Sequence, residues 1–161
     1  MLGMLAALAM VLSALEGLIP PIPGMPPGSK LGLSNLATMY AAFSLGPVPA
    51  LAVAVAKGLF AGITRGVVAM GMSLCGGLLS AAVMSLLLKA GKPFGWVGIG
   101  IAGALCHNGG QLMLAYLITG PAVVGYAPFL VLFALPTGAL TGLTLGIITP
   151  RLAKLEDRFF L

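Results

Sequence analysis

The sequence is poor in charge, and above all in acidic residues. Only 7% of its 161 residues are charged, and Asp and Glu together number three. Soluble domains carry charge on about a quarter of their residues, because their surfaces must face water. The composition therefore excludes an ordinary soluble domain. With Glu156 and Asp157 close to the C-terminus, the remaining carboxylate is Glu16, and metal-assisted diphosphate chemistry is hard to build.

Cysteine and histidine are also scarce. Cys75 and Cys106 lie inside apolar runs with no spacing that suits zinc, which indicates packing residues. The single histidine, His107, completes no Ser-His-Asp arrangement, and the sequence contains no phosphate-binding G-x-x-x-x-G-K-[ST] motif. We predict no enzyme activity, no cofactor and no metal site.

The eight Lys and Arg residues are scattered between apolar runs and form no basic stripe. A nucleic-acid interface normally gathers its cations on one face. We therefore expect no nucleic-acid partner, and we interpret the cations as topology signals and site residues.

Hydrophobic residues make up 60% of the chain, and its mean hydropathy is +1.14. A crossing of the ~30 Å hydrocarbon layer needs about 20 apolar residues, so the length allows roughly six crossings. The first apolar run lacks the basic start of a signal peptide, and we expect it to be kept as a span. The sequence predicts an all-α membrane protein, a single-domain bundle of six transmembrane helices, with spans at residues 2–18, 31–45, 48–66, 67–88, 94–118 and 123–148.

The orientation in the membrane follows from cations in short loops, which stay on the cytoplasmic side. Lys89 and Lys92 lie between the fourth and fifth spans, and Arg151, Lys154 and Arg158 follow the sixth. With six spans these positions share one side. We predict a multi-pass protein of the cell membrane, with both termini cytoplasmic and with residues 19–30, the turn at residue 65 and the turn at residues 119–122 facing outward.

Strong polar side chains within the predicted spans gather at their outer half. An ionisable group near the centre of a span costs ~2.5 to 3.5 kcal/mol on insertion scales, so it usually has a partner or a function. A shared depth favours a substrate-binding cavity open to the outside, and the excess of cations favours an anionic ligand with a carboxylate or phosphate. The alternative is that these groups only fix helix packing. The candidate residues are Glu16, Lys30, Asn35, Lys57, Arg65, His107, Asn108 and Gln111.

Residues 19–29 contain five prolines and two glycines and cannot be helical throughout. On the predicted topology this segment covers the outer end of the cavity. It is either a lid of fixed shape or a rigid connector.

Small residues recur at three- and four-residue steps in the first and last spans. In the first span they are Gly3, Ala6, Ala9 and Ser13, and in the last they are Gly138, Gly142 and Gly146. Such series let helices approach closely. They serve either internal packing or docking of a second membrane subunit.

Several local patterns resemble a known family. Residues 16–35 read E-x-L-I-P-x-x-P-G-x-P-P-G-x-K-L-G-L-x-N, followed by L-G-P at 45–47, Lys57, the Gly76-Gly77 pair, and A-x-x-H-N-x-G-Q at 104–111. Over nearly its whole length the chain resembles the Gx transporter family, often labelled heptaprenyl diphosphate synthase component I. That label implies a part in isoprenoid chain synthesis.

The arrangement is also similar to the S components of energy-coupling factor transporters. Those six-helix subunits bind a vitamin or related molecule from outside and dock, through small residues on the first helix, to a transmembrane coupling subunit driven by two ATPases. The resemblance implies that residues 19–29 cap the ligand and that the series of Gly3, Ala6, Ala9 and Ser13 docks. The usual Ala-x-x-x-Ala pattern is replaced here by Gly3-x-x-x-Ala7 and Ala9-x-x-x-Ser13.

Three functions follow from these observations. The first is a substrate-binding subunit of a transporter, capturing a small anionic molecule related to vitamins, prenyl compounds or flavins. The second is a non-catalytic membrane component of an isoprenoid, quinone or electron-transfer complex. The third is a catalytic prenyl diphosphate synthase component, which the missing carboxylates disfavour.

Overall fold

The computed structural model describes residues 1–18, 32–91 and 94–159, and the regular structure in these segments is entirely helical. This confirms the all-α prediction for the described part of the chain. The helices are α1 (Leu2–Gly17), α2 (Asn35–Ser44), α3 (Pro47–Arg65), α4 (Val67–Ala90), α5 (Trp96–Thr119), the short 3₁₀ helix η1 (Pro121–Tyr126) and α6 (Ala127–Phe159).

Most helix ends agree with the sequence prediction to within two residues. The narrow break between α3 and α4 is real, because Gly66 adopts a φ of +90° that interrupts the helix. At three ends the helix and the predicted span differ by more than two residues. Helix α2 begins at Asn35 and has only ten residues, whereas α6 begins after η1 and continues past Pro150, which does not end the helix.

Three helical segments are long and apolar enough to cross a membrane: α3, α4 and Pro121–Arg151. Helix α1 is apolar but has 16 residues, and the hydropathy of α5 is lowered by its central polar residues. Large apolar side chains cover the outside of the bundle, as at Ile63, which is 86% exposed. These features indicate insertion into a membrane. Six complete crossings remain a prediction.

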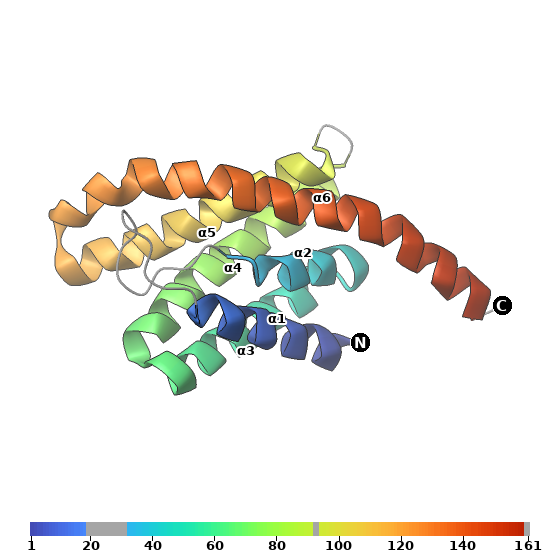
Figure 1. The fold of residues 1–161 in the computed structure, drawn as a ribbon, viewed down its shortest axis with the longest axis horizontal. Coiled ribbons are helices and arrows are strands. Elements are labelled where there is room, and N and C mark those ends of the chain that lie inside the picture. Colours follow the sequence, from blue (N-terminus) through green and yellow to red (C-terminus); the bar gives the residue numbers. More distant parts are fainter. Residues whose placement is uncertain (19–31, 92–93, 160–161) are drawn as a thin grey trace.

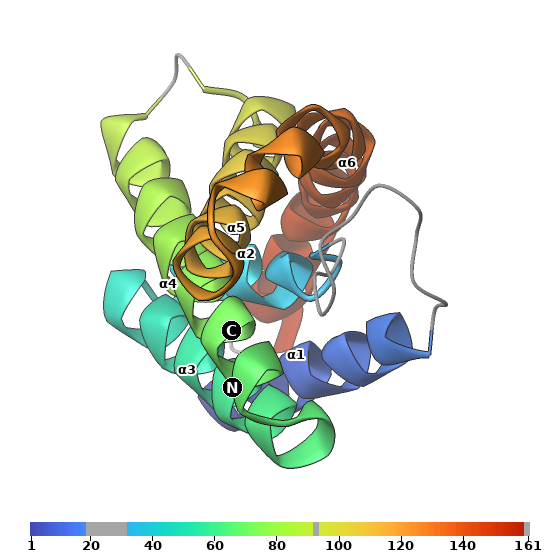
Figure 2. The ribbon, with the colours of Figure 1, turned by 90° about the vertical axis from the view of Figure 1, so that its left-hand side faces the viewer.

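Consecutive α-helices run in opposite directions along the long axis of the bundle (Figure 1). Helix α4 packs between α3 and α5, and α6 packs on α5. The short helix α2 touches each of the other five α-helices, while α1 contacts only α2 and α3 (Figure 2). Both chain ends lie toward one end of the bundle, and the α3–α4 and α5–α6 turns lie at the other. This is the arrangement that termini on one side of a membrane require; the side itself stays a prediction.

The glycines of the last span lie in the interface between α5 and α6. A Cβ atom on Gly138 would come within 2.5 Å of the Cα of Ile101, and a Cβ on Gly142 within 2.5 Å of the Cα of Val97. Because real Cβ atoms do not approach this closely, the two backbones can touch only where side chains are missing. These glycines serve internal packing.

The small residues of α1 point largely into the bundle as well. Ala9 and Ser13 are fully buried, Ala6 is half-buried, and Gly3 is exposed. A partner that contacts Ala9 or Ser13 would have to displace α1, so docking through this series remains a prediction. The large apolar side chains that α1 exposes are those of Leu2, Met4, Leu8, Val11 and Leu15.

Candidate polar binding site

A carboxylate in the last turn of α1 fixes the chain that enters α2. The side chain of Glu16 is only 6% exposed. Its Oε1 atom accepts the backbone N–H groups of Gly32 at 2.6 Å and of Leu33 at 2.7 Å. Gly32 has a φ of +89°, a conformation that glycine adopts without strain. This contact holds the turn that sets Asn35 as the first residue of α2.

Lys57, near the middle of α3, is 1% exposed. Its Nζ donates a hydrogen bond of 2.9 Å to the Oδ1 of Asn35. The end of the side chain passes over Gly77 of α4, where an added Cβ would lie 3.6 Å from the lysine Cε. The ammonium therefore lies where α2, α3 and α4 meet.

The imidazole of His107 lies between α4 and the segment that precedes α2. A Cβ on Gly76 would come within 2.8 Å of its Nδ1, and a Cβ on Gly32 within 3.1 Å of its Cδ2. Two glycines from distant parts of the sequence thus leave room for one ring. On the next turn of α5, the amide Nε2 of Gln111 lies 3.0 Å from the Nε2 of His107. A neutral ring with its proton on Nδ1 accepts this amide N–H.

These side chains border a small cavity of about 10 Å³, room for about one water molecule. Its walls come from α1, the turn before α2, α3, α4 and α5, and all but one of the lining residues are polar. We call this space the polar cavity. It is lined by Ser13, Ser34, Lys57, Arg65, Ala69, Ser73, His107 and Gln111.

The charge around the polar cavity is predominantly positive. Lys57 and Arg65 both line it, and the nearby Glu16, which attracts Arg65 electrostatically, is bound through one oxygen to two backbone N–H groups. Within the described residues no group of His, Cys, Asp or Glu is arranged to hold a metal ion. The site offers ammonium, guanidinium, hydroxyl and imidazole groups, which suit a carboxylate or phosphate.

The structure brings most of the predicted site residues together. Four line the polar cavity, and Glu16 and Asn35 support it through the contacts described above. Asn108 does not belong to it, because its Nδ2 donates 2.8 Å to the carbonyl oxygen of Leu130 in α6. Lys30 and the proposed cap at 19–29 lie outside the described residues. The four lining residues are Lys57, Arg65, His107 and Gln111.

Sequence reasoning missed two hydroxyl groups of the polar cavity, those of Ser34 and Ser73, and considered Ser13 only for docking. The sequence gives only a weak indication of these hydroxyl groups, because each belongs to a serine within an apolar run at the same depth as the other polar residues. The space-making roles of Gly32 and Gly76 depend on contacts between distant segments.

Among the comparisons with known proteins, the comparison with protein-family models gives a match. The model of the family described as heptaprenyl diphosphate synthase component I matches residues 5–148, which include every described residue of the polar cavity. Neither the curated proteins nor the solved structures include a match. The likeness to energy-coupling factor S components therefore stays a prediction.

Proposed function

The chain belongs to the heptaprenyl diphosphate synthase component I family, and we propose that it is a membrane-embedded binding subunit that captures a small anionic molecule in the polar cavity. The observation that carries this proposal is that the buried side chain of Lys57 and the exposed side chain of Arg65 line the same polar cavity. Under this proposal the protein binds and releases its ligand and makes no covalent bonds.

The ammonium of Lys57 is costly to place within a membrane span. A lysine at the centre of a membrane span costs ~2.5 to 3.5 kcal/mol on insertion scales, and such residues usually mark a ligand or ion path. Asn35, which accepts the Lys57 hydrogen bond, is neutral. Lys57 and Arg65 both line the cavity, and an anionic ligand would place an opposite charge between these two cations.

The proposed ligand is a small carboxylate or phosphate related to vitamins, flavins or prenyl compounds. The polar cavity holds about one water molecule, so ligand entry requires one wall to move. Helix α1 contacts only α2 and α3 and carries Ser13 in that wall. Moving α1 would open the cavity while breaking fewer contacts than moving α4, which is packed between α3 and α5.

A transporter role requires partners, because no nucleotide-binding motif appears in the sequence. We propose a transmembrane coupling subunit with ATPases, a location in the cell membrane, and cytoplasmic termini. The word component in the family's description supports the need for partner proteins.

The same description favours a second candidate, a non-catalytic component of a membrane complex for isoprenoid or quinone synthesis. In that case the exposed apolar face of α1 would hold an enzyme subunit, and the polar cavity would only fix helix packing. The two candidates differ in what the protein carries and in what it contacts.

Small-molecule capture is tested by purifying the protein in mild detergent and identifying co-eluting compounds by mass spectrometry. We expect wild type to retain an acidic compound that Lys57→Met lacks. Arg151→Met, which removes an exposed cation of α6 outside the polar cavity, is the matched control and should retain the compound. If wild type and Lys57→Met carry the same compounds, or neither carries any, the proposal fails.

Partner identity is tested with a photo-crosslinking amino acid at Leu8, which is exposed on α1. A transporter subunit should crosslink to a membrane protein that copurifies with ATPases. Crosslinking to a prenyl synthase enzyme instead would favour the second candidate.

A further inference from the structure

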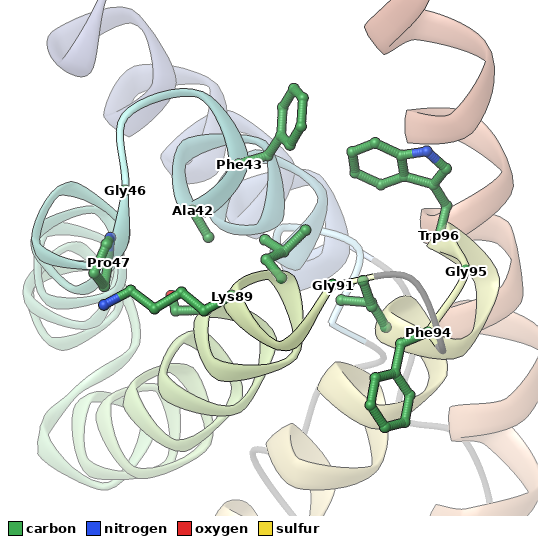
Figure 3. A pocket seen from close by; sticks show the side chains of 12 residues that line it. Ala42, Phe43, Gly46, Pro47, Lys89, Gly91, Phe94, Gly95 and Trp96 are labelled. Carbon is green, nitrogen blue, oxygen red and sulfur yellow. The ribbon is translucent and has the colours of Figure 1, made fainter.

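A second pocket has a volume of about 600 Å³ (Figure 3). Its lining elements meet at the end of the bundle opposite the α3–α4 turn (Figure 1). It is formed where α2 turns into α3, where α4 ends and where α5 begins. It shares no lining residue with the polar cavity. We call it the terminal pocket.

The walls of the terminal pocket are mainly apolar and aromatic. The rings of Phe43 and Trp96 meet edge to face, with centroids 4.9 Å apart and planes at 71°. Leu88, Phe94 and Ile99 also line the space, and in Figure 3 the Phe94 ring lies away from the Phe43–Trp96 pair. Such a surface suits a hydrocarbon chain.

One edge of the pocket is cationic. Lys89, in the last turn of α4, extends toward Gly46 and Pro47 of the α2–α3 turn (Figure 3). Among the described residues it has no hydrogen-bond or ion-pair partner. The N-terminal end of α5 also lines this space, and its first residues receive no side-chain cap. The helix dipole there adds to the attraction for negative charge.

The terminal pocket lies at the ends of helices, where a membrane surface is expected, and it combines a tryptophan with a lysine. Tryptophan and lysine are enriched at membrane surfaces, where an aromatic ring meets the hydrocarbon boundary and an amine reaches the headgroups. A headgroup beside Lys89 would leave its chain free to lie along Phe43 and Trp96.

We propose that the terminal pocket binds an anionic amphiphile, a molecule with a phosphate headgroup at Lys89 and a hydrocarbon chain against Phe43 and Trp96. Two sources share this chemistry: an anionic phospholipid of the bilayer and an isoprenoid diphosphate. The proposal is independent of capture in the polar cavity, because the two sites share no lining residue.

The chain offers its own reporter, since Trp96 is its only tryptophan. The protein is placed in phosphatidylcholine nanodiscs that contain a few per cent of a lipid with brominated acyl chains, which quench tryptophan on contact. We expect brominated phosphatidylglycerol to quench Trp96 more strongly than brominated phosphatidylcholine at the same level. Equal quenching by the two lipids would overturn the proposal.

Two variants test the two parts of the site. Lys89→Gln should lower the preference for the anionic lipid about fivefold, as expected for one cation at a membrane surface. Gly95→Leu should abolish the preference by filling the pocket, and the backbone at Gly95 has open space for a side chain.

Matched controls lie nearby. Gly98→Leu adds the same side chain one turn later in α5, also into open space and outside the pocket, and Arg151→Gln removes an exposed cation of α6. Both should keep the wild-type preference. If Gly98→Leu loses it as Gly95→Leu does, the pocket is not the site.

Competition distinguishes the two sources. Relief of quenching by farnesyl diphosphate, but not by inorganic diphosphate, assigns the pocket to isoprenoid diphosphates. Quenching that resists farnesyl diphosphate and yields to unbrominated phosphatidylglycerol assigns it to bilayer lipid. Relief by inorganic diphosphate alone would contradict a site that requires a hydrocarbon chain.

Discussion

Helix α5 is approached by glycines from both sides, and the two contacts differ in what the glycines accommodate. On one side Gly76 of α4 meets the carbonyl and ring of His107, and the neighbouring Gly77 lies under Lys57. On the other side Gly138 and Gly142 of α6 meet only backbone atoms of α5.

The difference shows that small residues in a helical bundle have two uses. Between α5 and α6 they let two backbones touch, which is the usual way in which helices associate in membranes. At Gly76 and Gly77 of α4 they leave room for the large polar side chains of His107 and Lys57. Substitutions on the α6 side should therefore affect stability, and those on the α4 side should affect binding as well.

The largest effect on binding is expected from Lys57→Met. A hydrogen bond to a charged group contributes about 1.5 to 3 kcal/mol, so affinity for the captured anion should fall roughly 10- to 100-fold. The melting temperature should change little, because removal of a buried charge offsets the loss of the hydrogen bond to Asn35. Equilibrium binding and thermal unfolding in detergent measure the two effects. A large loss of stability with unchanged affinity would make Lys57 a packing residue.

The pair Gly76→Ala and Gly138→Ala tests the comparison directly. Each added methyl group meets backbone atoms closer than 3.0 Å, so each should destabilise the protein by about 1 to 3 kcal/mol. Only Gly76→Ala displaces the ring of His107 and should also weaken binding. If Gly138→Ala weakens binding equally, the two glycine contacts do not differ in function.

Asn108→Leu should have a smaller effect, confined to stability. It removes the hydrogen bond to the Leu130 carbonyl, and such bonds between membrane helices contribute about 0.6 kcal/mol on average and up to about 1.7. Thermal unfolding should show this decrease while affinity stays at the wild-type value. Weaker binding would mean that Asn108 belongs to the site after all.

Gly77→Ala should have the smallest effect. Its added Cβ would lie 3.5 Å from the Ala54 Cβ and 3.7 Å from the Lys57 Nζ, which are ordinary contact distances. Alanine in place of a helical glycine restricts the unfolded chain, so stability should rise by about 0.4 to 1 kcal/mol. A loss of stability as large as that of Gly76→Ala would show that α4 approaches Lys57 more closely than the structure indicates.

Several features of the fold could be predicted from the sequence because they depend on local patterns. The length of the apolar runs predicts the helices, and the glycine at position 66 allows the sharp turn after Arg65. The short α2 was harder to predict, since its beginning depends on the side chain of Glu16, which lies far away in the sequence. An apolar run shows where a helix can form. It does not show that Glu16 binds the backbone at Gly32 and Leu33, so that α2 begins only at Asn35.

The site residues were grouped mainly by their depth in the membrane, and a shared depth does not show which way a side chain points around its helix. His107 and Asn108 are adjacent and lie at nearly the same depth, yet they point about 100° apart around the helix. One side chain lines the polar cavity and the other bonds to α6. Helical spacing already separated them, because Gln111 shares a face with His107 and Asn108 does not.

The terminal pocket could not be predicted, because Phe43 lies at the end of α2, far in the sequence from the α4–α5 connection that Lys89 and Trp96 flank. Each residue alone is an ordinary aromatic or basic residue at the end of a helix. Only the packing of α2 against α4 and α5 brings them together.

The most direct test of anion capture in the polar cavity is a thermal-shift measurement with matched charged and neutral compounds. Flavin mononucleotide is compared with riboflavin, and biotin is a carboxylate probe. The proteins are wild type, Lys57→Met and Arg151→Gln, which removes an exposed cation outside both pockets. We predict that at least one anionic compound raises the melting temperature of wild type and Arg151→Gln by several degrees and leaves Lys57→Met unchanged. Anion capture in the polar cavity is contradicted if none of the anions stabilises wild type. It is also contradicted if an anion that stabilises wild type stabilises Lys57→Met equally.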